Sequence, residues 1–298
     1  MLGNFNITYE EVYNWVKQSC THVSQDSIEI LQAALSQETS SSAKAMLSSM
    51  LENVDMADNE DKPVCQSPGY PTVYISFGST EGVDLLRQYV PMAMVEATKK
   101  GYARPSIVHS LNRQNPGDNS GDGVPNFEYQ YRPEQEYIEM IISFKGCGAE
   151  LGNVYKTMTT AQLGSDLKGL KTLVYETVIN AGGMPCPPSA IGIGIGGQMD
   201  VAAKLSREAI STRDWRDQNP DPLLNELEAE LLEKINMLGL GPAGIGGKTT
   251  CLAVKIGMAA THTAICPVAI NFHCWVARRF GVRLYPDGRR EYLFAKGE

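Results

Sequence analysis

The sequence predicts an α+β fold, with helices and short, mainly antiparallel strands in one interwoven body. Residues 9–53 place hydrophobic side chains at helical spacing, first at Ile28, Leu31 and Leu35 and then between 43 and 51. Short β-rich runs separated by short loops follow, and such runs are expected to pair antiparallel. No repeat or linker divides the chain, so residues 1–298 are expected to form one domain whose N-terminal part, about 1–55, is helical.

The remaining elements follow from local signals. The acidic, proline-bounded stretch 55–63 is expected to be a loop. Strands are predicted at 72–77, 127–131 and 137–144, a helix kinked at Pro91 at 83–99, a loop at 112–125, and a hairpin turn at 284–289.

Residues 221–238 give the clearest helix signal. Asp221 can cap the N-terminus, Pro222 suits the first turn, and Gly239 can end the helix. Its hydrophobic face comprises Leu224, Leu227, Leu231, Ile235 and Leu238.

Composition limits the function classes. The 298 residues are 43% hydrophobic and 20% charged, as in ordinary globular proteins. A net charge of −8 argues against binding of nucleic acid or an anionic membrane. The most apolar stretch, 177–199, is interrupted by prolines and glycines, and the N-terminus lacks the pattern of a signal peptide. A soluble, cytoplasmic protein is therefore expected.

The seven cysteines do not suggest a disulfide framework, because their number is odd and the chain is not small. No Cys-x-x-Cys pair is present, which excludes zinc ribbons and thioredoxin-type motifs. Buried thiols remain possible, as does a metal site assembled from distant positions.

Glycine-rich segments are ambiguous. Gly192–Gly197 satisfies Gly-x-Gly-x-x-Gly, but a loop for close backbone approach is favoured over a dinucleotide site. Residues 241–250 resemble a phosphate loop, yet Pro242 stands where glycine is required, so ATP and GTP are rejected while Lys248 could still meet an anion. Residues 145–150 taken alone indicate a turn.

Polar candidates are weak when taken singly. The loop at 112–119, with Arg113, Asn115, Asp118 and Asn119, is polar enough to bind a carboxylate, although a lone arginine is usually exposed. A lone histidine such as His262 is more often structural than catalytic.

Taken in order, the segments form a recognisable series. They are Cys65-Gln-Ser-Pro-Gly, 112–119, 145–150, Cys186-Pro-Pro, 241–248 and the stretch from His262 to Trp275. The series resembles the iron–sulfur hydro-lyases, namely class I fumarase and the α subunits of two-subunit fumarases and L-tartrate dehydratase. The resemblance covers residues from about 25 to about 280.

The resemblance implies a [4Fe–4S] cluster held by Cys65, Cys186 and Cys274, with Cys266 as the rival for the third position. Three thiolates leave one iron open, and that iron can act as a Lewis acid toward a small dicarboxylate substrate. An open iron is also expected to make the activity sensitive to oxygen.

The resemblance also implies roles for other residues and for partners. Arg113 and Gln66 would contact substrate, His262 would position or protonate it, and Lys145 and Lys248 would build the pocket floor. The family's catalytic base and several carboxylate-binding arginines belong to a second domain. A separate β subunit is therefore expected, in a dimer of α chains or an α2β2 assembly.

Two positions depart from the family pattern. Ser67 replaces the aspartate that follows Cys-Gln, and Thr261 replaces the usual arginine before the histidine. The 112–119 loop favours reversible hydration of fumarate to L-malate, with L-tartrate dehydratase or mesaconate hydratase as alternatives. A catalytically altered cluster-binding homologue is a further alternative, and a nucleotide-binding protein is the third class.

Overall fold

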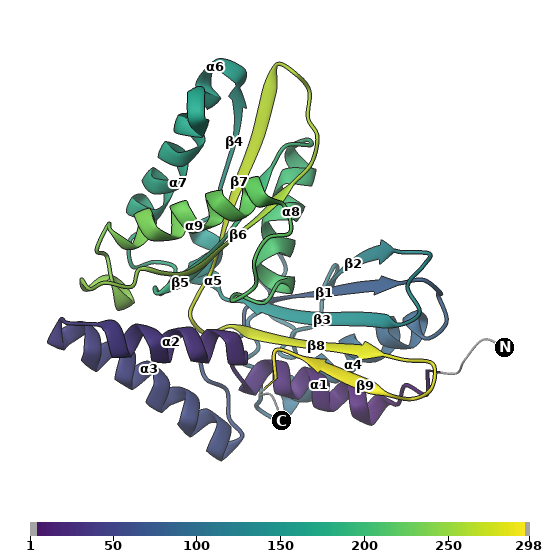
Figure 1. The fold of residues 1–298 in the computed structure, drawn as a ribbon. Coiled ribbons are helices and arrows are strands. Elements are labelled where there is room, and N and C mark those ends of the chain that lie inside the picture. The colour runs from purple at the N-terminus through teal and green to yellow at the C-terminus, as the bar shows by residue number, and fades with distance from the viewer. Residues whose placement is uncertain (1–4, 296–298) are drawn as a thin grey trace. The chain divides into compact units, whose positions relative to one another are not determined.

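The structure, a computed structural model, describes residues 5–295 (Figure 1). The chain forms two compact units built from segments distant in the sequence. The first unit comprises residues 5–25, 53–146 and 276–295, and the second comprises 26–52 and 147–275. The α+β class with mainly antiparallel strands is confirmed. That residues 1–298 together form one catalytic domain stays a prediction.

The N-terminal part is helical, as predicted, with α1 (Tyr9–Thr21), α2 (Gln25–Gln37) and α3 (Ser41–Glu60). Thr8 caps α1 through a capping box with Glu11. The loop predicted at 55–63 is wrong over most of its length, because α3 continues to Glu60. Val54 and Ala57 are buried, and no glycine or proline interrupts the helix before Pro63.

The first unit is built on a five-stranded sheet in the order β2-β1-β3-β8-β9. Its strands are β1 (Tyr70–Phe77), β2 (Asn126–Tyr131), β3 (Ile138–Lys145), β8 (Arg278–Leu284) and β9 (Arg290–Leu293). The pairs β1–β3, β3–β8 and β8–β9 are antiparallel. The pair β1–β2 is parallel, which the prediction of antiparallel pairing missed. The predicted strands and the β8–β9 hairpin turn are otherwise confirmed.

The hydrophobic core of the first unit lies between this sheet and helices α1 and α4 (Val83–Lys99). Cross-strand partners on β3 and β8, such as Ile142 and Phe280, share the core face, and Trp15 of α1 stacks on Phe280. Pro91 lies inside α4, as predicted.

The second unit is built on a four-stranded sheet in the order β4-β7-β5-β6. The strands are β4 (Val154–Thr159), β5 (Ser189–Ile195), β6 (Cys251–Met258) and β7 (Ile265–His273). Only β5 and β6 pair in parallel, through a connection that contains α8 (Met199–Thr212) and α9 (Pro222–Asn236). The other helices between residues 147 and 275 are α5 (Cys147–Leu151), α6 (Thr160–Leu163), α7 (Lys168–Ala181) and the 3-10 turns 165–167 and 242–244.

Helices cover both faces of the second sheet, with α8 on one face and α7 and α9 on the other (Figure 1). Gly192 and Gly194 belong to strand β5, so the loop predicted for this segment is wrong. The expected close backbone approach is present, because a Cβ on either glycine would lie about 2 Å from a carbonyl oxygen of α8. The glycines therefore serve helix–strand packing.

The helix predicted at 221–238 is confirmed as α9, and the Asp221 carboxylate accepts hydrogen bonds from the N–H groups of Leu223 and Leu224. No helix within residues 5–295 is both long and apolar enough to cross a membrane.

Candidate functional site

Two of the predicted cluster ligands, Cys186 and Cys274, lie at one end of the second sheet. Ala190 of β5 is opposite His273 of β7, and the two strands are antiparallel. Cys274 directly follows β7, and Cys186 precedes β5 by three residues. The exposed Cys186 adopts a left-handed backbone conformation with φ +55° between two prolines, whereas Cys274 is buried. The fold of the second unit thus places both thiols at the same sheet edge.

The glycine-rich segment 241–250 lies at this edge as well, because it leads directly into β6. The N–H of Ala243 donates to the Pro187 carbonyl at 2.6 Å, and the N–H of Ser189 donates to the Thr250 carbonyl at 3.1 Å. The Lys248 ammonium donates to the Gln37 carbonyl at 3.0 Å, at the end of α2. Lys248 is therefore engaged in holding the segment to α2.

Cys65 belongs to the first unit, in the connection between α3 and β1. It is half-buried, and its Sγ accepts a hydrogen bond from the Ser67 N–H at 3.5 Å. The neighbouring Gln66 is exposed, with its Oε1 3.6 Å from the Cys65 Sγ. A Cβ at Gly69 would lie 2.0 Å from the carbonyl oxygen of the buried Lys145, so glycine is required where this loop packs on the end of β3.

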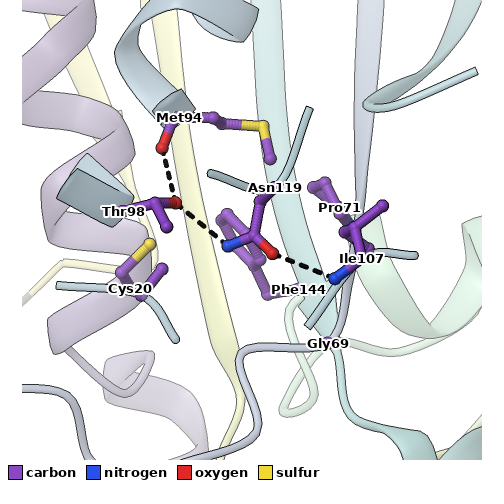
Figure 2. A pocket seen from close by; sticks show the side chains of 9 residues that line it. Cys20, Gly69, Pro71, Met94, Thr98, Ile107, Asn119 and Phe144 are labelled. Atoms are coloured by element: carbon purple, nitrogen blue, oxygen red, sulfur yellow. Dashed lines mark hydrogen bonds between the residues drawn. The ribbon is translucent and has the colours of Figure 1, made fainter. Parts of the chain in front are cut away.

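In the polar loop that carries Arg113, the asparagine side chains form hydrogen bonds with the protein itself. Asn119 is buried beside a small cavity, where its Nδ2 donates to Thr98 and its Oδ1 accepts from the Ser106 and Ile107 N–H groups (Figure 2). The carboxylate of Asp118 accepts from Ser120, whose hydroxyl and N–H lower the Asp118 pKa.

Arg113 is the exception in this loop, because its side chain is exposed. The one hydrogen bond of its side chain within residues 5–295 runs to the Ser110 carbonyl at 3.4 Å, and its backbone φ is +62°. Asn115 instead donates to the Pro105 carbonyl and accepts from the Gly117 N–H. Of the four polar residues proposed for this loop, only Arg113 has a side chain available to bind a ligand.

His262 lies in the turn between β6 and β7, where its side chain is exposed and its Nδ1 accepts from the Ala264 N–H at 3.2 Å. Strand β7 separates His262 from Cys274, and nine strand residues span about 30 Å. Within one chain, His262 and the Cys186–Cys274 pair thus occupy opposite ends of the second sheet.

The other cysteines have different surroundings. All seven thiols are free. Burial raises the pKa of Cys20 and of Cys251 to about 12, and burial also raises the pKa of Cys266. Cys266 occupies the His262 end of β7, away from Cys186. Cys147 is exposed at the start of α5.

The donor set fits an iron–sulfur cluster in its chemistry. Cys65, Cys186 and Cys274 are free thiols, and thiolates are the ligands such clusters require. Among residues 5–295, no three His, Cys, Asp or Glu side chains are gathered as a metal-binding group.

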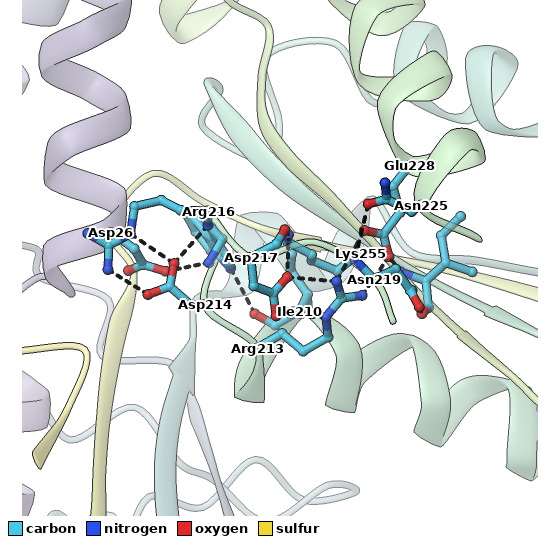
Figure 3. Close-up of polar contacts among 12 residues, drawn as sticks. Asp26, Ile210, Arg213, Asp214, Arg216, Asp217, Asn219, Asn225, Glu228 and Lys255 are labelled. Carbon is cyan, nitrogen blue, oxygen red and sulfur yellow. Dashed lines mark hydrogen bonds and ion pairs between the residues drawn. The ribbon is translucent and has the colours of Figure 1, made fainter. Parts of the chain in front are cut away.

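A dense charged network in the second unit is fully bonded. Glu228 accepts from Arg213, from the Asn219 amide and from the Ile256 N–H, at 2.5, 2.8 and 2.7 Å (Figure 3). Lys255 donates to both the carbonyl and the carboxylate of Asp217. These bonds join the end of α8 to α9 and β6, so the network is structural.

Sequence reasoning missed several buried cations, and the most deeply buried of them is Arg278, the first residue of β8, which is 1% exposed. The signal was available, because Arg278 occupies the core-facing phase that continues with Phe280, Val282 and Leu284.

Comparison with known proteins identifies the family. The model of the family described as fumarate hydratase (Fumerase) matches residues 9–283. A protein of Methanocaldococcus jannaschii named "Putative L(+)-tartrate dehydratase subunit alpha" is 36% identical over 92% of this chain and 96% of its own length. The "L(+)-tartrate dehydratase subunit alpha" of Escherichia coli is 30% identical over 93% of this chain and 91% of its own.

A third relative, the "Putative fumarate hydratase class I" of Geobacillus stearothermophilus, is 32% identical over 97% of this chain. The match spans 58% of that longer protein. The breadth of these matches and the order of the shared segments agree, and the chain belongs to the fumarate hydratase family of hydro-lyases.

Proposed function

We propose that this chain is the α subunit of a [4Fe–4S] hydro-lyase that reversibly hydrates fumarate to L-malate together with a separate β subunit. The observation that carries the proposal is the register of β5 and β7, which brings Cys186 and Cys274 to one sheet edge. Cys266 lies at the other end of β7, which favours Cys274 as the companion of Cys186. Cys65 is proposed as the third ligand.

The chain's own residues support the chemistry in separate ways. When bound, the cluster supplies an open iron that acts as a Lewis acid toward the substrate hydroxyl and carboxylate. The Ser67 N–H donates to the Cys65 sulfur and so helps to orient this side chain in its loop. The left-handed backbone of Cys186 keeps its thiol exposed at the sheet edge. Gln66 and Arg113, both exposed, are proposed to bind substrate oxygens.

The β subunit is proposed from the relatives and from the proposed site. Two of the relatives are named as α subunits, and this chain covers more than nine-tenths of each. His262 lies too far from Cys274 along β7 to act at the same cluster within one chain in this conformation. A residue of another subunit is therefore proposed to supply the acid–base step in an α2β2 assembly. L-tartrate is the first alternative substrate, since relatives named as L(+)-tartrate dehydratase subunit alpha match this chain. Mesaconate is the second alternative, and it rests on the resemblance to the family alone.

Anaerobic reconstitution with iron and sulfide tests the ligand set. About four irons per chain are expected, with loss of most iron in Cys65→Ala, Cys186→Ala and Cys274→Ala. Cys147→Ala, which removes an exposed thiol, is the matched control and should retain the iron. Loss of iron in Cys266→Ala with retention in Cys274→Ala would overturn the assignment.

Activity is tested with the β subunit present and oxygen excluded. Hydration of fumarate, followed at 240 nm, is expected to exceed dehydration of L-tartrate, and exposure to air should abolish it. A complex that carries iron and acts on L-tartrate alone would replace the proposed substrate while keeping the reaction class.

A further inference from the structure

Arg278 is buried at a core-facing position of β8, where a hydrophobic residue would be expected. Arg278 is opposite Phe144 in the β3–β8 pair, and the next residues on the same face, Phe280 and Val282, belong to the hydrophobic core. Arg278 is the most voluminous of the fully buried side chains. A charge in such a position is strongly unfavourable unless it is paired.

No group of the described chain supplies that pairing. Within residues 5–295 the buried Nε of Arg278 has no hydrogen-bond partner, and no carboxylate forms an ion pair with its guanidinium. Cys20 of α1 lies close enough to sense the charge, but burial raises the pKa of its thiol to about 12, so Cys20 stays neutral. Within residues 5–295 the positive charge of Arg278 therefore lacks a counter-ion.

The guanidinium lies next to the loop that carries Cys65. A Cβ at Gly146 would lie 3.6 Å from Nη2 of Arg278, 3.7 Å from Oγ of Ser67 and 3.9 Å from the Ser67 carbonyl oxygen. Glycine thus leaves space between a cationic donor and a hydroxyl donor. Ser67 is half-buried and follows the exposed Gln66, so this space adjoins the surface of the first unit.

We propose that Arg278, with the Ser67 hydroxyl as a second donor, binds a carboxylate of a small organic acid. A planar guanidinium can donate two parallel hydrogen bonds to one carboxylate. Because Arg278 is buried, its guanidinium has already lost its hydration before a carboxylate binds. Serine matters at position 67, because an aspartate there would place a permanent carboxylate beside Nη2. That the anion is a substrate carboxylate rests on the proposed function, whereas the existence of the anion site does not.

Succinate, an unreactive dicarboxylate, is the probe, and isothermal titration of the full reconstituted chain gives its dissociation constant. Arg278→Gln is expected to weaken succinate binding about 10- to 100-fold, and Arg278→Lys by less. Arg289→Gln removes an exposed arginine of the same unit and should leave the affinity unchanged. Circular dichroism and iron content check that each variant is folded and loaded.

The Ser67 variants separate a binding role from a structural one. Ser67→Asp is expected to abolish succinate binding and to raise the thermal midpoint, because the new carboxylate pairs with Arg278. Ser67→Asn, its uncharged isostere, should produce no rise in the midpoint. A folded Arg278→Gln variant with unchanged succinate affinity would overturn the proposal. Ser67→Asp that still binds succinate would do the same, as would loss of iron rather than of succinate in Arg278→Gln.

Turnover distinguishes this proposal from the proposed function. If the complex hydrates fumarate and the succinate affinity is unchanged in Arg278→Gln, the site fails while the function stands. If the complex hydrates no dicarboxylate but succinate binding still depends on Arg278, the function fails while the site stands.

Discussion

Arg213 of the second unit and Arg278 of the first are held in opposite ways. Arg213 is half-buried and donates to two carboxylates, those of Glu228 and Asp217 (Figure 3). Burial opposes the charge on Arg213, but the hydrogen bonds that it donates to these carboxylates raise its pKa. Arg278 is more deeply buried, and its Nε has no partner within residues 5–295.

The comparison distinguishes a buried charge that stabilises the fold, as on Arg213, from a buried charge that is proposed to bind a ligand, as on Arg278. Around Glu228 every buried donor meets an acceptor, so the network positions α9 against β6. Around Arg278, in contrast, no partner within residues 5–295 offsets the free-energy cost of removing the guanidinium from water. Such a residue persists where binding supplies the missing partner, in the way that functional sites commonly retain unfavourable interactions.

The largest effect is expected from Glu228→Leu in the second unit. The change removes the acceptor for Arg213, Asn219 and the Ile256 N–H together and leaves an arginine without its buried partner. The free energy of unfolding should fall by about 3–5 kcal/mol, measured by urea denaturation. Glu228→Gln, which keeps one acceptor oxygen, should lose less. Equal losses in the two variants would show that the negative charge of Glu228 matters and that the retained acceptor oxygen contributes nothing.

A change of opposite sign is expected when each arginine is replaced by methionine. Arg213→Met should lower the free energy of unfolding by about 2 kcal/mol, because it strands Glu228, whereas Arg278→Met should leave it equal or raise it by about 1 kcal/mol. Thermal midpoints of the two variants, recorded without succinate or other carboxylates, provide the test. A marked loss of stability in Arg278→Met would show that its guanidinium contributes to folding and would remove the contrast.

Local signals in the sequence were sufficient for most elements of the fold. Asp221 and Pro222 begin α9 by satisfying its first N–H groups, a property that needs no tertiary information. The end of α3 depends instead on burial of Val54 and Ala57, and the strand around Gly192 depends on the approach of α8. Both are tertiary effects, so acidic or glycine-rich composition alone predicted loops there.

The residues of the candidate site stay a prediction from the sequence, and their arrangement could not be predicted from it. The spacing of Cys186 and Cys274 along the chain carries no information about the β5–β7 register that brings them to one edge. Two adjacent arginines suggest exposure, yet Arg278 and Arg279 are only 1% and 4% exposed. For Arg278 the alternation with Phe280 and Val282 indicates burial, since residues two apart on a strand share a face.

The smallest effect concerns Glu38, which anchors the segment 241–250 to the end of α2. Its carboxylate accepts from the N–H groups of Thr39, Ser40 and Lys248 at 2.7, 3.0 and 2.7 Å. Burial favours the neutral acid, but these three hydrogen bonds prevail and lower the Glu38 pKa below its ordinary value near 4.5. The stabilisation is therefore complete above about pH 4.5 and is lost as the pH falls through the lowered pKa.

Glu38→Gln should cost about 1 kcal/mol at pH 7 and flatten the decline in stability on acidification. Glu52→Gln, an exposed neighbour on α3, should leave the acid profile unchanged. Urea midpoints between pH 3 and 7 give both profiles. An unaltered profile in Glu38→Gln would show that the charge of Glu38 does not stabilise the contact between this segment and α2, and would leave the Lys248–Gln37 hydrogen bond as the stabilising contact with that helix.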